Sequence, residues 1–318
     1  MSKDSKISEG SVTVEDLREA LKEVLPALGK QDDILHMRYP QGISICSPAM
    51  ERITRDLQRF ITPAPSVAPR FESLLLVGAD GKGGAGSTAL AAWAAANASS
   101  KGYADYVRFV TALDLLTGGG VGDEARATAL VDKFSEARES KSSLLILDDV
   151  DQICAGDGNG GYSSIMLSTL RALLRSPPQN QSNTRSGGRK EDATGKSMQV
   201  IAATSRSDAA CRTLHDMFGE TLVVPLLSKK EEVTKLFTEC ALSEALVDKE
   251  AMADLIVTRL GPVACKTALR LAQRSVATAD HIWPDETGRK ADLQFRTLSE
   301  ILDDLAGDEG SLNALCNI

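Results

Sequence analysis

Along the middle of the chain, short apolar runs alternate with longer segments whose apolar positions recur every three to four residues. This alternation is typical of parallel strands that are covered by helices. The expected strands are Leu74–Val77, Tyr106–Val110, Leu144–Leu147, Gln199–Thr204 and Thr221–Val224. Helices are expected between them at 88–99, 123–139 and 162–175. The pattern predicts an α/β fold with a doubly wound, parallel, five-stranded sheet.

After Pro225 the strand pattern ends and only helical periodicity remains. Helices are expected at 228–242, 249–260, 262–278 and 295–306. Ser228 and Glu231 have the spacing of a capping box at the start of the first of these helices. We therefore expect an α/β domain over 46–225 and a smaller C-terminal helical lid domain over 226–318.

The first part of the chain has a different character. Apolar positions between 14 and 28 follow a helical period, a polar stretch follows at 30–33, and a second helix is expected from Ser47 to Phe60. Residues 1–45 are interpreted as either a packing arm or an inter-domain linker. Residues 176–198 are rich in Pro, Ser, Asn and Gly, which predicts a mobile surface insertion.

Composition narrows the class of protein. The 318 residues are 42% hydrophobic, enough for a soluble globular chain of about two domains. The net charge of −8 argues against a general nucleic-acid or anionic-membrane surface. Six scattered cysteines and three histidines indicate neither a disulfide framework nor a zinc site. Without a targeting signal or a membrane-spanning run, the expected location is cytoplasmic.

A glycine-rich loop follows the first expected strand. It fits the phosphate-loop pattern G-x-x-x-x-G-K-[ST] except that Ser87 stands where the lysine belongs. Glycine N–H groups can turn inward on a phosphate at the start of a helix, and the Thr88 hydroxyl can bind Mg²⁺. The short, neutral Ser87 cannot reach a phosphate as lysine does. The candidate nucleotide-binding residues here are Gly81, Lys82, Gly83, Gly84, Ala85, Gly86, Ser87, Thr88 and Ala89.

The missing lysine leaves alternatives open. Lys82 could turn its ammonium toward the phosphates from within the loop, or a neighbouring subunit could supply a cation. Nucleotide could also bind weakly or not at all. The remaining interpretation is a glycine-rich turn between strand and helix that has no ligand.

Candidate catalytic groups follow two other expected strands. Asp148 could coordinate Mg²⁺ through water, and Asp149 lies where a base would polarise an attacking water. Glutamate, with its longer arm, is expected at position 149 of a fast hydrolase, so the aspartate predicts slow turnover. Thr204 and Ser205 could orient water or contact a γ-phosphate. The alternatives are that the aspartates only begin a turn and that Ser205 only caps a helix.

Together these segments resemble the AAA+ ATPases, and more narrowly the second ATPase domain of the N-ethylmaleimide-sensitive factors, the vesicle-fusing ATPases. The segments that carry the resemblance are Ser73–Gly78, Ser87–Ala92, Leu144–Asp151, Leu173–Pro178 and Ala202–Arg206. The longer loop, the missing lysine and the insertion depart from that family. The resemblance implies a P-loop AAA+ fold that binds ATP and Mg²⁺. It also implies that Ile43 lies over the adenine and that Lys266 of the helical domain reaches the phosphates.

The resemblance further implies a partner set. The leading hypothesis is a domain that binds ATP mainly to support hexameric ring assembly in vesicle fusion, either with itself or with a full-length vesicle-fusing ATPase. SNAP adaptors and SNAREs would be indirect partners, and membranes would be met only through partners. Hydrolysis would be slow or absent, and the chain alone would not disassemble SNAREs. The alternatives are a nucleotide-independent pseudo-ATPase module and an active ATPase that uses Lys82.

Overall fold

The computed structural model describes nine segments of the chain. They are residues 32–40, 42–63, 70–79, 83–116, 122–156, 161–177, 196–206, 211–282 and 287–307. The helix expected between 14 and 28, Gly81 and Lys82 lie outside the described residues. So do residues 178–195, which are most of the expected insertion.

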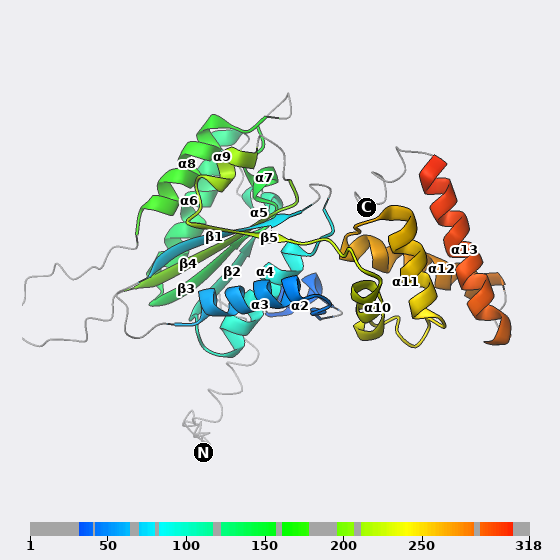
Figure 1. The fold of residues 1–318 in the computed structure, drawn as a ribbon. Coiled ribbons are helices and arrows are strands. Elements are labelled where there is room, and N and C mark those ends of the chain that lie inside the picture. Colours follow the sequence, from blue (N-terminus) through cyan, green and yellow to red (C-terminus); the bar gives the residue numbers. More distant parts are fainter. Residues whose placement is uncertain are drawn as a thin grey trace, which may run out of the picture.

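All five expected strands are present in one parallel sheet, which confirms the predicted α/β class. The strands are β1 (Phe71–Gly78), β2 (Tyr106–Val110), β3 (Ser142–Leu147), β4 (Ser197–Thr204) and β5 (Glu220–Val224). Their order across the sheet is β2-β3-β4-β1-β5, so β4 lies between β3 and β1 (Figure 1).

The apolar runs form strands because the sheet is buried on both faces. Within β1, Leu75 and Val77 face one core and Leu74 and Leu76 face the other. Successive side chains of a strand point to opposite faces, so a strand buried on both sides needs a continuous apolar run.

Helices cover the two faces of the sheet (Figure 1). On one side lie α2 (Asp32–Arg38), α3 (Pro48–Ile61) and α4 (Ser87–Ser100). On the other lie α5 (Ala112–Leu116), α6 (Asp123–Glu139), α7 (Val150–Ile153), α8 (Ser164–Arg175) and α9 (Arg212–His215). The short helices α2, α5, α7 and α9 were not predicted, and α2 begins within the stretch expected to be only polar.

Four helices follow the sheet and share a separate hydrophobic core. They are α10 (Lys230–Glu239), α11 (Lys249–Leu260), α12 (Cys265–Ile282) and α13 (Thr287–Gly307). The capping box expected from Ser228 and Glu231 was wrong. The Glu232 carboxylate instead accepts the backbone N–H groups of Ser228 and Lys229, at 2.9 and 3.2 Å, and the helix begins at Lys230.

A buried arginine fixes the short helix that follows β3. Arg126 of α6 donates to the carbonyl oxygens of Ile153 at 2.6 Å and Ala155 at 2.8 Å. Its guanidinium also pairs with Asp123 at 3.0 Å. Carbonyl groups at the end of a helix have no partner within the helix, so Arg126 satisfies groups that α7 leaves open.

Replacing Arg126 with methionine should lower the free energy of unfolding by about 2–4 kcal/mol, because buried carbonyl groups lose their donor and Asp123 loses its partner. Chemical denaturation measures this change. Arg171→Met, on an exposed position of α8, is the matched control and should stay within about 0.5 kcal/mol of the unsubstituted chain. Equal effects of the two substitutions would contradict the assigned role of Arg126.

Candidate functional site

The sheet order brings the three predicted site segments to one edge. Val77 of β1 pairs with Thr204 of β4, and Leu147 of β3 pairs with Ala202 of β4. The glycine loop, Asp148 and Ser205 each follow one of these adjacent strands. Ligands of open α/β sheets bind at such carboxyl ends, where connections diverge to opposite faces.

The described part of the glycine loop has backbone conformations that favour glycine. Gly83, Gly84 and Gly86 have φ values of 81°, 90° and 109°, and Gly86 is the N-cap of α4. An L side chain in this region of φ is strained. Ser87 and Thr88, both partly exposed, form the first turn of α4, so the loop ends at a helix N-terminus as predicted.

The Thr88 hydroxyl donates to Oδ1 of Asp148 at 2.7 Å, which joins α4 to the end of β3. Asp148 is only 3% exposed, and its other oxygen lies 3.9 Å from the guanidinium of Arg38 in α2. Burial raises the pKa of Asp148, whereas the Thr88 hydrogen bond and the Arg38 charge act in the opposite direction. Asp148 and Thr88 are thus neighbours, as a shared role would require.

Asp149 has a special backbone conformation. Its φ of 47° is the one positive value at a non-glycine residue within the described segments. The residue is exposed overall, yet nearby protein atoms desolvate its carboxyl and, with the charges of Asp148 and Asp151, raise its pKa to about 6. Arg38 and Lys266 oppose this rise. The Asp149 carboxyl therefore gains its proton at a higher pH than an ordinary aspartate does.

The two hydroxyls expected after β4 have different surroundings. Thr204 is fully buried and donates to Oδ1 of Asp151 at 2.7 Å, so its hydroxyl holds α7 against β4. The expectation that Thr204 could contact a phosphate was wrong for this reason. Ser205 lies against the loop instead, since a Cβ added to Gly83 would be 3.4 Å from the Ser205 Cβ.

Lys266, at the start of α12, contacts the glycine loop. Its backbone N–H donates to the Gly84 carbonyl oxygen at 3.0 Å, and a Cβ added to Gly84 would lie 3.2 Å from the Lys266 Cβ. Its positive charge also lowers the pKa of Asp149. The helical part of the chain therefore brings a cation to the loop.

Ile43 is partly buried and packs on the same side of the sheet as α4 and Cys265. A hydrogen bond between the thiols of Cys46 and Cys265 lowers the pKa of Cys46 and raises that of Cys265. The segment that contains Ile43 is thus close to the start of α12, beside Lys266.

Sequence reasoning missed two charged groups at this edge. Asp151 could have been found, because it directly extends the acidic segment after β3. Arg38 gave no signal, because it lies 110 residues before Asp148 in a helix that was not predicted. Arg126, which lies behind this edge and holds α7 in place, was also not predicted.

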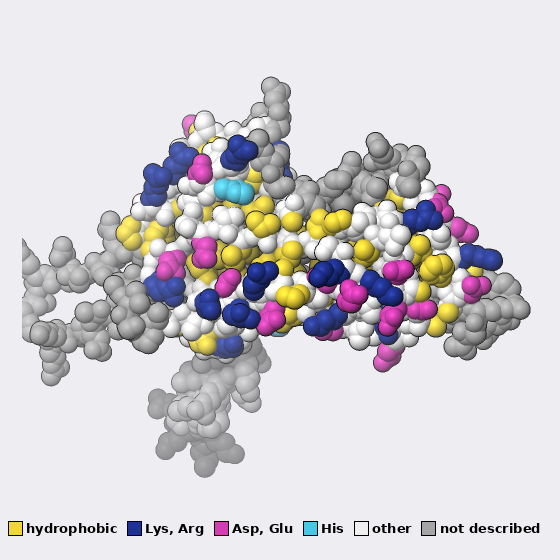
Figure 2. All heavy atoms as spheres, in the orientation of Figure 1, with side chains coloured by type: hydrophobic (Ala, Val, Ile, Leu, Met, Phe, Trp, Pro, Cys, Tyr) yellow, Lys and Arg dark blue, Asp and Glu magenta, His cyan; other side chains and the backbone are white. Residues whose placement is uncertain are grey.

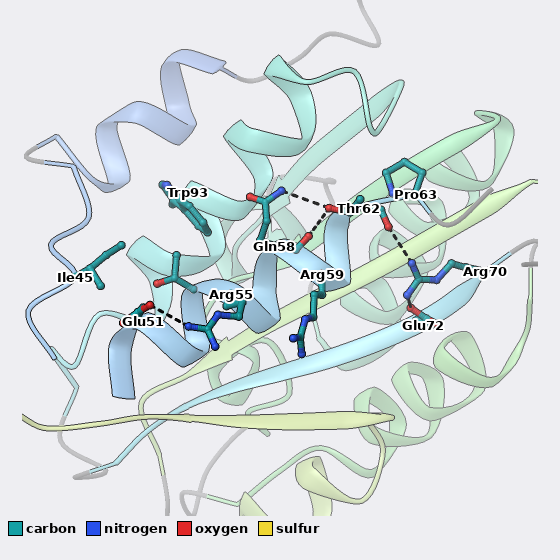
Figure 3. A pocket seen from close by; sticks show the side chains of 11 residues that line it. Ile45, Glu51, Arg55, Gln58, Arg59, Thr62, Pro63, Arg70, Glu72 and Trp93 are labelled. Atoms are coloured by element: carbon teal, nitrogen blue, oxygen red, sulfur yellow. Dashed lines mark hydrogen bonds and ion pairs between the residues drawn. The ribbon is translucent and has the colours of Figure 1, made fainter. Parts of the chain in front are cut away.

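A groove of about 790 Å³ lies elsewhere on the α/β part of the chain (Figure 3). It is lined by α3, the start of β1, Ile45 and Trp93. Its arginines have acidic partners: Arg55 pairs with Glu51 at 2.9 Å, and Arg70 pairs with Glu72. On the face drawn in Figure 2, basic and acidic side chains are likewise interspersed. The groove shares no residue with the glycine loop or the carboxylates.

Comparison with known proteins agrees with this geometry. Residues 74–226, which span all but the first residues of β1 and end just after β5, match the family described as "ATPase family associated with various cellular activities (AAA)". The chain contains an AAA ATPase domain.

The chain is also homologous to vesicle-fusing ATPases. It is 28% identical over 257 residues to that of Arabidopsis thaliana, covering 78% of this chain and 31% of the relative. The vesicle-fusing ATPase of Dictyostelium discoideum is 25% identical over 73% of this chain and 29% of its own length. A vesicular-fusion protein of Saccharomyces cerevisiae is 28% identical over 55% of this chain and 22% of its own length. The chain thus spans less than a third of the length of these relatives.

None of the helices that the structure describes is long and apolar enough to cross a membrane.

Asp149→Asn in the AAA domain should become increasingly stabilising, relative to the unsubstituted chain, as pH rises from about 4 to about 6. A raised pKa means that the folded state binds the Asp149 proton more tightly than the unfolded state does, so ionisation destabilises the fold across this range. Asparagine also tolerates a positive φ. Melting temperatures of both chains between pH 4 and 8 measure the effect. A difference that does not change with pH would contradict the raised pKa.

Gly84→Ala should destabilise the AAA domain more than Gly102→Ala. Both glycines have positive φ, which costs an alanine roughly 1–2 kcal/mol, but only the Gly84 Cβ would press on Lys266. A Cβ at Gly102 would meet nothing within 4 Å, so that variant measures strain alone. Denaturant unfolding of both variants tests the loop contact with α12, which would be refuted by equal losses.

Proposed function

We propose that this AAA domain binds ATP mainly to support ring assembly within a vesicle-fusion machine, and that it hydrolyses ATP slowly or not at all. The observation that carries the proposal is the junction of the glycine loop with the carboxylates through the Thr88–Asp148 hydrogen bond of 2.7 Å. The family implies nucleotide binding, and this junction joins the helix that follows the loop to a carboxylate at the end of β3, at the same edge of the sheet.

Phosphate binding would rest on the backbone of the loop. The N–H groups at the start of α4 carry the positive end of the helix dipole, which favours an anion. Lys266 lies against Gly84, so its ammonium would add a charge from the helical part, while Ser205 borders Gly83. Ile43 would cover the adenine from the segment beside α12.

The donor atoms at this edge fit Mg²⁺. The Thr88 hydroxyl and the Asp148 carboxylate are hard oxygen donors, which this ion prefers, and phosphate oxygens would complete its shell. Within the described residues no group of three or more His, Cys, Asp or Glu side chains could hold a metal alone. Binding of Mg²⁺ would therefore depend on nucleotide. When bound, the ion would neutralise phosphate charge.

Weak hydrolysis is inferred from two residues. Ser87 supplies no positive charge to the transferred phosphoryl group, and stabilisation of that charge is the main task of a phosphoryl-transfer site. Asp149 would act as the base with a pKa near 6, and Ser205 would orient the water. The aspartate arm is one methylene shorter than glutamate, so the base would be held away from the attacking water.

The proposed partners follow from the resemblance to the vesicle-fusing ATPases, and the relatives are named as a vesicle-fusing ATPase and a vesicular-fusion protein. The domain would assemble with copies of itself or with a full-length vesicle-fusing ATPase, as part of a hexameric ring in the cytoplasm. SNAP adaptors and SNAREs would be reached through that assembly.

A second candidate function has one observation in its favour. The Gly84 carbonyl accepts the Lys266 N–H at 3.0 Å, so a direct protein contact joins the loop to α12. A nucleotide-independent assembly module would use this arrangement. The hypothesis of an ATPase that uses Lys82 stays a prediction, because Lys82 lies outside the described residues.

ATP with Mg²⁺ should raise the melting temperature of the chain. A ligand at ten times its dissociation constant stabilises a folded protein by about 1.4 kcal/mol, which corresponds to about 2–4 °C for a domain of this size. Ser87→Lys should enlarge the shift by adding the missing charge. Thr88→Val is the control for the metal and should reduce the shift obtained with Mg²⁺.

Light scattering with and without ATP should show larger assemblies with ATP. A melting temperature unchanged at millimolar ATP would contradict ATP binding, and assembly that ignores ATP would favour the second candidate.

A further inference from the structure

The carboxylates at the end of β3 outnumber the cations that the glycine loop supplies. Asp148, Asp149 and Asp151 lie within four consecutive residues, and Ser87 contributes no charge. Arg38 and Lys266 are cations whose charges lower the pKa of Asp149. Lys266 belongs to the contact between the loop and α12, whereas Arg38 has no place in the site that the sequence predicts.

Arg38 is held in place by its surroundings without being enclosed by them. Its guanidinium carbon lies 5.0 Å from the centre of the Phe109 ring, and a terminal nitrogen lies 3.9 Å from Oδ2 of Asp148. That distance exceeds a hydrogen bond, so this contact is an ion pair only. The side chain is 40% exposed. A ring that orients the guanidinium plane and an exposed edge together suit recognition of an external anion.

The helix that carries Arg38 is anchored next to the glycine-loop helix. Leu35 of α2 is fully buried in the same core as Leu90 of α4. Asp148 links the two helices a second time, because it contacts both Thr88 and Arg38. Arg38 is therefore tied, through one carboxylate, to the residue that follows the substituted position 87.

We propose that Arg38 binds the phosphate groups of the nucleotide in place of the lysine that Ser87 replaces. This inference rests on the proposed function. Asp148 holds the guanidinium beside Thr88, and a triphosphate, which carries more negative charge than one carboxylate, recruits its exposed N–H groups. The planar guanidinium presents parallel donors that match two phosphate oxygens, so it can serve from a neighbouring helix without the reach of a loop lysine.

The test is a calorimetric titration of the full chain with ATP and, separately, with inorganic tripolyphosphate, each with and without Mg²⁺. Arg38→Met keeps an apolar stem over Phe109 and removes the charge. It should weaken the binding of both ligands by about tenfold, which is about 1.4 kcal/mol. Arg55→Ala is the matched control, because Arg55 is also an exposed, ion-paired helical arginine but lies in α3 away from the loop. It should bind like the unsubstituted chain.

A rescue separates a charge role from a structural one. Ser87→Lys introduced into Arg38→Met should restore the affinity for ATP, because the lysine returns a phosphate-binding cation to the loop. Arg38→Lys should retain part of the affinity. If Arg38→Met does not melt cooperatively, Arg38→Gln provides a second neutral variant with a polar side chain, and the same loss is expected.

The outcomes separate the two claims. An unsubstituted chain that fails to bind ATP overturns the proposed function, and this inference falls with it. An unsubstituted chain that binds ATP, together with folded Arg38→Met and Arg38→Gln variants of equal affinity, overturns the role of Arg38 alone. Loss of ATP binding with full retention of tripolyphosphate binding would also overturn it, because the phosphates would not be the groups that Arg38 contacts.

Discussion

The carboxylate of Asp148 must be compensated where it lies, and this requirement organises the edge of the sheet. β3 is an interior strand, so the residue that follows it is 3% exposed. A buried charge is costly unless it is paired and hydrogen-bonded. Thr88 of α4 donates to one oxygen, Arg38 of α2 lies beside the other, and the Asp149 backbone adds a hydrogen bond. One carboxylate thereby ties two helices to the end of the sheet.

A second polar contact lies behind the first. The Thr204 hydroxyl donates a hydrogen bond to Asp151, and Arg126 donates to carbonyl groups at the end of α7. These contacts hold Asp149 between two fixed neighbours in a left-handed conformation that most residues avoid. The raised pKa of Asp149 follows from this placement, since its carboxyl is partly desolvated and lies near two other acids.

The strands and long helices could be predicted because they depend on patterns within single segments. The runs at Leu74–Val77 and Leu144–Leu147 are short and apolar throughout, as is typical of strands buried on both faces. The Mg²⁺ roles expected for Thr88 and Asp148 implied a shared site, but the hydrogen bond between them was not predicted. Arg38 could not be found in this way, because its role depends on the packing of α2 against α4, in which Leu35 of α2 enters the shared core. Thr204 was misjudged because a sequence does not show which strand-end hydroxyl has a buried carboxylate as its neighbour.

With serine at position 87, the positive charge for a bound phosphate has to come from outside the described part of the glycine loop. A loop lysine belongs to the same turn as the amides that cradle a phosphate, so it serves the ligand whatever the rest of the chain does. Arg38 and Lys266 instead belong to α2, which precedes the strands in the sequence, and to α12, which follows them. The two helices pack in different hydrophobic cores. A phosphate that needs both cations gains its full affinity only when both helices are in place, and a ligand favours a conformation by the difference in its affinities. Under the proposed function, nucleotide would therefore stabilise one arrangement of the helical part against the loop, which serves assembly. Turnover would instead require a cation that stabilises the transition state, and no described residue of the loop supplies one.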